Sequence, residues 1–224
     1  MRELSVFVDE SGTQEGTSEY YLVTLVFHDQ EDVLQSYLAA YEHSLRERGL
    51  PDIPFHAEPL MRAHGAYTQL TPSTRHQELV SFSAFVRRLP VHYVTFSYRS
   101  DNVAGREGLL LSLKRDIINY LFDHLEYFQR FDQVKIYYDN GQPTVTGALH
   151  AAMEYVLSRG VVVYRSTGYQ KYRLSQVADY VCMVELAALK YVRGEATETD
   201  KRFFGLSTQF KKNYLKQVRR KLLN

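Results

Sequence analysis

The stretch "LSVFVDESGT", residues 4–13, sets the question that the rest of the sequence has to answer. Leu4, Val6 and Val8 lie two residues apart among β-branched and aromatic neighbours, which predicts a buried or half-buried strand over residues 3–9. Asp9 and Glu10 follow at once, and a Ser-Gly pair then marks a turn. A carboxylate at the end of a core strand needs an ionic partner, access to water or a bound cation.

The composition is typical of one globular domain spanning residues 1–224. Hydrophobic residues make up 45% of the chain and charged residues 24%. Cys182 is the single cysteine, so no internal disulfide can form, and this predicts a reducing, cytoplasmic location. No window of about 18 apolar residues predicts a membrane span, and the N-terminus has no signal-peptide pattern.

The positive charge is concentrated at the C-terminal end. Residues 201–224 contain eight of the 27 Lys and Arg residues, including Lys211 and Lys212, and none of the 26 acids. A basic helical extension on a more acidic body predicts a polyanionic partner. The alternative is a solvated amphipathic helix that packs on the domain.

The order of the predicted elements indicates an α/β fold. Strands are expected at residues 3–9, 20–28, 91–99, 132–139 and 161–166. Helices are expected at residues 29–49 with Asp29 as the cap, after Ser73 or Thr74 as the cap, and at 105–130, 143–160, 173–194 and the basic end. Residues 51–72 are expected to be irregular. Strands separated by helices favour parallel pairing, so we expect a mixed sheet with helices on both faces.

Two predicted strands end in an aspartate. Asp9 ends the first strand, and Asp139 ends the strand "VKIYYD". If these strands are neighbours, the two carboxylates lie close together, and a hard divalent cation such as Mg²⁺ or Mn²⁺ would relieve their repulsion. The alternative is that each aspartate caps the next turn or faces water.

A third acid, Asp179, lies in a helix that is apolar nearly all round and is therefore expected to be buried. Gln176 precedes it by three residues, so the two side chains point to one side of the helix. A metal site beside the sheet would give both a polar destination. The alternative is an ion pair between Asp179 and Arg165 or Arg173.

The segments "VFVDESGT", "FHAEPL", "IYYDNGQ" and "LSQVADYV" together resemble the domain-of-unknown-function 3800 family, which is similar in architecture to ribonuclease H-like nucleases and integrases. The resemblance implies a ribonuclease H-like mixed sheet with an initial hairpin, here followed by a helical insertion. It also implies a divalent-metal site in which Asp9, Asp139 and Asp179 are the carboxylates of the first strand, the fourth strand and the C-terminal helix. Glu10 and Glu58 compete for the place of a fourth acid.

These patterns lead to the hypothesis of a metal-dependent nuclease or phosphodiesterase. Two metal ions would bridge the scissile phosphate, and His56 would move a proton or orient the water, or else be a structural histidine. The alternatives are an inactive ribonuclease H-like module that binds nucleic acid or protein, and a small-molecule phosphohydrolase. The residues expected to contact RNA or DNA are Arg165, Lys171, Arg173, Gln176, Lys211 and Lys212.

Overall fold

A five-stranded mixed sheet organises the part of the chain that the computed structural model describes, which is residues 1–12, 19–99, 101, 105–138, 143–157, 161–165 and 172–223. The strands are β1 (Glu3–Ser11), β2 (Tyr20–Asp29), β3 (His92–Arg99), β4 (Gln133–Tyr138) and β5 (Val161–Arg165). Their order in the sheet is β3-β2-β1-β4-β5. The pairs β1–β2 and β2–β3 are antiparallel, whereas β1–β4 and β4–β5 are parallel.

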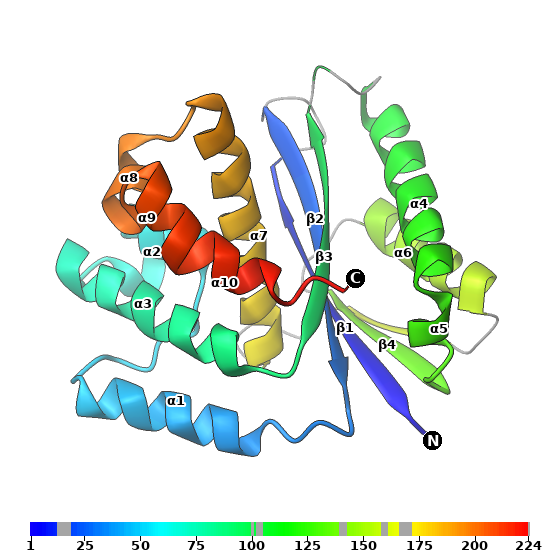
Figure 1. Ribbon diagram of the computed structural model, residues 1–224, viewed down its shortest axis with the longest axis horizontal. Coiled ribbons are helices and arrows are strands. Elements are labelled where there is room, and N and C mark those ends of the chain that lie inside the picture. The colour runs from blue at the N-terminus through cyan, green and yellow to red at the C-terminus, as the bar shows by residue number, and fades with distance from the viewer. Residues whose placement is uncertain are drawn as a thin grey trace.

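Helices cover both faces of this sheet, as the sequence predicts (Figure 1). One face carries α4 (Gly105–Asp123), α5 (Leu125–Phe128) and α6 (Pro143–Leu157). The other carries α1 (Gln35–Glu47), α2 (Ala57–Arg62), the 3₁₀ turn Gly65–Tyr67, α3 (Pro72–Arg88), α7 (Arg173–Arg193), α8 (Glu198–Phe204), α9 (Ser207–Phe210), the π-helical turn η3 (Lys211–Leu215) and α10 (Lys216–Arg219).

The alternation in β1 decides which face receives its polar end. Leu4, Val6 and Val8 pack in the core under α4 and α6, and Phe7 packs in the core under α7. Because successive side chains in a strand point to opposite faces, Asp9 follows Phe7 onto the α7 face. The strand continues to Ser11, two residues beyond its predicted end.

Three local predictions are wrong. Asp29 does not cap a helix, because β2 runs on to include it and α1 begins only at Gln35. The cap of α3 is Thr71, whose hydroxyl accepts the Thr74 amide. Residues 51–72, expected to be irregular, contain α2 and a 3₁₀ turn.

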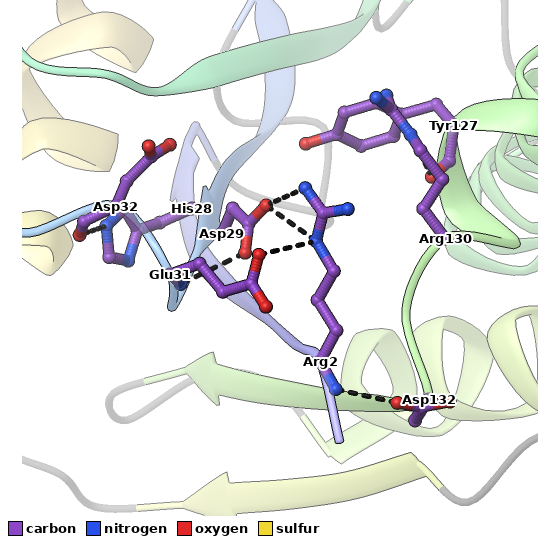
Figure 2. Close-up of polar contacts among 8 residues, drawn as sticks. All are labelled: Arg2, His28, Asp29, Glu31, Asp32, Tyr127, Arg130 and Asp132. Atoms are coloured by element: carbon purple, nitrogen blue, oxygen red, sulfur yellow. Dashed lines mark hydrogen bonds and ion pairs between the residues drawn. The ribbon is translucent and has the colours of Figure 1, made fainter.

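Asp29 instead belongs to a polar cluster at the sheet end where β1 begins (Figure 2). The Arg2 guanidinium donates to the Asp29 carboxylate and lies 3.4 Å from Glu31, while the Arg2 amide donates to Asp132. The same guanidinium lies over the Phe131 ring. These contacts hold the starts of β1 and β4 and the end of β2 together. Burial alone would raise the pKa of Asp29, but the hydrogen bond from the Arg2 guanidinium keeps this pKa below its usual value.

The basic C-terminal segment packs onto the domain. Its aromatic residues Phe203, Phe204, Phe210 and Tyr214 are buried in the same core as α3 and α7. The chain end then pairs with β3, because the amide of Tyr93 donates to the Lys221 carbonyl. None of the helices in the described part of the chain is long and apolar enough to cross a membrane.

Glu78 on α3 is a buried carboxylate on the helical side of the core. Its side chain is 3% exposed, and its Oε1 has no hydrogen-bond partner among the described residues. Burial and the nearby Asp52 raise the pKa of Glu78 from 4.5 to about 7, while Arg173 opposes the rise. The folded state therefore binds this proton more tightly than the unfolded state does.

We expect Glu78→Gln to stabilise the protein at pH 8 by about 2 kcal/mol, the order of magnitude that such a pKa shift implies. Well below pH 4.5 the carboxyl is protonated in both the folded and the unfolded state, so its burial does not lower the free energy of unfolding. Above pH 7 it is ionised in both states, and the full loss of stability is reached. The gain should consequently vanish at pH 4. Urea unfolding at both pH values measures it, with the exposed Glu47→Gln as the matched control, and an equal gain at the two pH values would contradict the assignment.

Candidate functional site

One face of α7 forms the wall of a cleft at the end of β1. Helical spacing places six side chains on this face: Asp179, Cys182, Met183, Leu186, Ala187 and Lys190. The opposite walls come from the end of β1, from α2 and from the start of α8. The cleft has a volume of about 480 Å³ and brings together Asp9, Glu10, His56, Glu58 and Asp179. Five of the six residues predicted as catalytic therefore line one cavity.

Asp179 is fixed by the backbone of the segment that enters α2. The amide of Ala57 donates to Oδ2 of Asp179 over 2.8 Å. One turn earlier on α7, the fully buried Gln176 accepts the Phe55 amide through its Oε1 over 3.0 Å. Two side chains of α7 thus satisfy two backbone donors of residues 55–57, and this orients the Asp179 carboxylate at the cleft.

Asp9 lies next to another side chain of α7, Cys182. The thiol of Cys182 lies beside the side chains of Asp9 and Thr24, close enough for Asp9 and Cys182 to act on each other's pKa. Thr24 on β2 in turn forms a hydrogen bond with Thr95 on β3 over 2.8 Å. Burial, followed by the charge of Asp9, raises the pKa of the Cys182 thiol well above its usual value, so the thiol stays neutral.

The two carboxylates destabilise each other. Burial raises the pKa of Asp9 well above its usual value, and the charges of Asp179 and Glu10 raise it further. Burial likewise raises the pKa of Asp179 to about 6, although His56 and the Ala57 amide act in the opposite direction. The site therefore concentrates negative charge where solvation is poor.

No Lys or Arg side chain in the described part of the chain forms an ion pair with Asp9 or Asp179. The predicted ion pair of Arg173 with Asp179 does not form, because Arg173 pairs with Asp52 and lies over the Tyr41 ring. An oxygen-rich pair of carboxylates without a cationic side chain suits a hard divalent cation such as Mg²⁺ or Mn²⁺. Within the described residues, however, no group of three or more His, Cys, Asp and Glu side chains is placed to hold a metal ion.

The third predicted ligand, Asp139, lies outside the described residues. The strands that lead to Asp9 and Asp139 are parallel neighbours, with Val8 opposite Tyr138. The sequence analysis expected the two acids to meet only if their strands are neighbours, and the strands are neighbours.

The two candidates for a fourth acid both line the cleft. Glu10 accepts a hydrogen bond from the Tyr21 hydroxyl. The Glu58 carboxylate lies near the surface, 3.4 Å from the Arg62 guanidinium and 3.7 Å from the His64 ring.

The residues predicted to contact nucleic acid are distributed over several places. Gln176 has no exposed surface and is engaged with Phe55, so in this structure it does not reach a ligand. Lys211 and Lys212 are exposed on η3. Lys171 and the side chain of Arg165 lie outside the described part of the chain.

Sequence reasoning missed two cations that line the cleft, Arg62 and Lys190. Lys190 lies on the α7 face eleven residues after Asp179, and its Nζ is 3.5 Å from Asp200. Thr197 and Asp200 form a capping box that starts α8 at this wall. The helical spacing from Asp179 to Lys190 was the available signal, but only the folded chain shows which face of α7 borders the cavity.

No protein-family model matches the chain, and no curated protein matches it either. Among solved structures, ribonuclease HII in the PCNA:RNase HII complex from Archaeoglobus fulgidus aligns with 99% of this chain and 91% of its own at 15% identity and a TM-score of 0.44. Ribonuclease H2 from Pyrococcus horikoshii OT3 aligns with 98% of both chains at 16% identity and a TM-score of 0.43.

The sheet itself describes the fold more fully than these alignments do. Its antiparallel β1–β2–β3 half, its parallel β1–β4–β5 half and the helices on both faces make a ribonuclease H-like α/β domain. Asp9 lies near the carboxyl end of β1, the central strand. Open α/β sheets place their binding sites at the carboxyl ends of their strands.

We expect Gln176→Leu to lower the free energy of unfolding by about 1–3 kcal/mol, because it leaves the buried Phe55 amide without an acceptor. Thermal or urea unfolding measures the change. The exposed Gln77→Leu on α3 is the matched control and should change the stability by less than about 0.5 kcal/mol. Equal effects of the two substitutions would show that the contact with Phe55 contributes nothing.

Proposed function

We propose that the chain is a divalent-metal-dependent nuclease or related phosphodiesterase that acts on nucleic acid through the cleft between β1 and α7. The observation that carries the proposal is the juxtaposition of Asp9 and Asp179, two poorly solvated carboxylates with raised pKa values and no Lys or Arg partner among the described residues. Membership of the domain-of-unknown-function 3800 family and a cytoplasmic location are part of the same proposal. They rest on the sequence motifs and on the single cysteine.

Asp9 and Asp179 would hold the cation, with Asp139 as the third ligand implied by the sequence motif. A divalent cation bound there would stabilise charge on a phosphoryl oxygen and lower the pKa of a bound water. The donors suit Mg²⁺ or Mn²⁺ because they are carboxylate oxygens, while the neighbouring Cys182 thiol is kept protonated.

The chain's own residues divide the remaining tasks. The Ala57 amide occupies Oδ2 of Asp179 and so fixes the direction of the carboxylate. His56 borders the same cavity and is close enough to act electrostatically on Asp179, so it is the group placed to accept or return a proton. Lys190 lines the cleft beside Asp200 and would turn from this ion pair to a substrate phosphate.

The second candidate is a ribonuclease H-like module that binds nucleic acid without cleaving it. The observation in its favour is that no group of three acidic, His or Cys ligands is formed by the described residues. Cleavage assays separate the two candidates directly.

We expect the protein to cleave labelled RNA or DNA in the presence of Mg²⁺ or Mn²⁺ and to be inactive in EDTA. Asp9→Asn and Asp179→Asn should each lower the rate at least about 100-fold, because each removes a charge that holds the cation. The matched control is Asp123→Asn, an exposed carboxylate on α4, which should leave the rate unchanged.

A second measurement detects the cation without reference to catalysis. Mg²⁺ or Mn²⁺ should raise the melting temperature of the wild type and of Asp123→Asn, since a ligand that binds the folded state stabilises it. It should not do so for Asp9→Asn or Asp179→Asn. Metal-dependent cleavage that survives both substitutions would refute the assignment of the site, and a metal-stabilised protein without cleavage would favour the binding module.

A further inference from the structure

A second cavity, of about 630 Å³, lies between α3 and the C-terminal helices. Figure 1 shows α8, α9 and α10 on the side of α3 that faces away from α1. We call this cavity the α3–α8 groove, after the helices that carry its main walls. The groove is larger than the acidic cleft and shares no lining residue with it, although helix α8 contributes different residues to each.

The charged groups that line the α3–α8 groove are all positive. Arg87, Arg202 and Lys212 come from three separate elements, α3, α8 and η3, and no Asp or Glu lines the groove. Within the described part of the chain, none of these three cations lies within 4 Å of a carboxylate, although Arg202 acts at longer range on Glu198. Three converging cations without a paired anion indicate a site for an anionic ligand.

The rest of the lining suits a ligand larger than a single phosphate. Val80 and Ala84 of α3, with Phe203 and Phe204 of α8, form an apolar floor. Neutral hydrogen-bonding groups complete the walls: Ser83, Gln209, Asn213 and Gln217. An apolar floor under a cationic rim matches a nucleotide unit, whose base and sugar need contact area and whose phosphate needs positive charge.

The position of the groove favours a nucleic-acid strand over an acidic peptide. Helix α8 separates the groove from the acidic cleft: Thr199 and Asp200 line the cleft, while Arg202 and Phe203 line the groove. A seven-residue helix is only about 10 Å long. A strand that enters the cleft at one end of α8 therefore reaches the groove within a few nucleotides.

The relative placement of cleft and groove is fixed by Arg75, which is 5% exposed. Its guanidinium donates to the carbonyls of Leu60 and Met61 at the end of α2, over 2.6 and 3.0 Å, and lies over the Phe203 ring of α8. One α3 side chain thus joins a wall of the cleft to a wall of the groove. The spacing between the two cavities is consequently set by the core.

We propose that the α3–α8 groove binds the phosphodiester backbone of the substrate strand a few nucleotides from the phosphate held in the acidic cleft. This inference rests on the proposed function for the identity of the strand, but its contacts involve no residue of the cleft. Arg87, Arg202 and Lys212 bind successive phosphates, and the apolar floor contacts the sugar and the base between them.

Binding of 5′-labelled U12 and dT12, measured by fluorescence anisotropy in EDTA, tests the inference separately from catalysis. We expect the triple variant Arg87→Gln/Arg202→Gln/Lys212→Gln to bind the oligonucleotide that the wild type prefers about 10- to 100-fold more weakly at ~0.1 M salt. The slope of log K against log salt concentration should fall in magnitude by about 2, since each phosphate contact to a single strand contributes about 0.7.

The matched control removes the same charge from exposed cations outside the groove, in Arg46→Gln/Lys114→Gln/Arg193→Gln. This control should bind within about twofold of the wild type. Its melting temperature and that of the groove variant should equal that of the wild type, so that weaker binding cannot reflect unfolding.

Two outcomes would overturn the inference. The first is that the groove variant keeps the affinity and the salt slope of the wild type. The second is that a poly-glutamate peptide displaces the oligonucleotide at equal charge concentration, which would make the groove a site for acidic proteins. Groove-dependent binding together with a wild type that never cleaves would contradict the proposed nuclease activity alone, because the binding assay contains no divalent cation.

Discussion

The repulsion between the carboxylates of Asp9 and Asp179 is the constraint on which the account of this protein depends. Both groups are poorly solvated, each has a raised pKa, and no Lys or Arg among the described residues neutralises either. Such an arrangement lowers the stability of the fold when the groups are ionised, and the divalent cation that we propose for this site would relieve the repulsion. The Ala57 amide orients the Asp179 carboxylate, and the Cys182 thiol beside Asp9 is neutral, so neither group cancels the negative charge.

The rest of the helical layer keeps this crowded pair in place. Helix α7 crosses β1 and β2 with an apolar surface and presents Gln176, Asp179 and Cys182 to the polar end of the sheet. Arg75 then connects α2 to α3 and α8, so that the acidic cleft and the cationic groove occupy fixed positions on either side of α8. Acidic side chains thereby outnumber basic ones in the cleft, while all three Lys and Arg side chains of the adjacent groove lack an acidic neighbour in the lining, as the proposed binding of a phosphodiester strand requires.

The sequence predicted what depends on local pattern. The alternation of residues 4–8 placed Asp9 on a core strand, and the apolar surface of the helix around Asp179 predicted that this helix is buried against the sheet. Both predictions are confirmed, although Asp179 itself is half-buried at the cleft. What depends on partners distant in the sequence was not accessible. Asp29 was predicted to cap a helix because its real partner, Arg2, is 27 residues away in the sequence and on another strand. Likewise, β3 pairs antiparallel with β2 although three helices lie between them in the sequence. Gln176 was expected to face the metal site and to contact nucleic acid, but its oxygen accepts the amide of Phe55, 121 residues away in the sequence, which no local pattern reveals.

The most direct test of the central claim is a crystal structure of the protein soaked in Mn²⁺, with anomalous scattering recorded at a wavelength where manganese contributes strongly. We expect an anomalous peak beside the carboxylate oxygens of Asp9 and Asp179, at metal–oxygen bonding distance from both. A structure in which these two side chains lie too far apart to share an ion, or in which a lysine or arginine occupies the position between them, would contradict it.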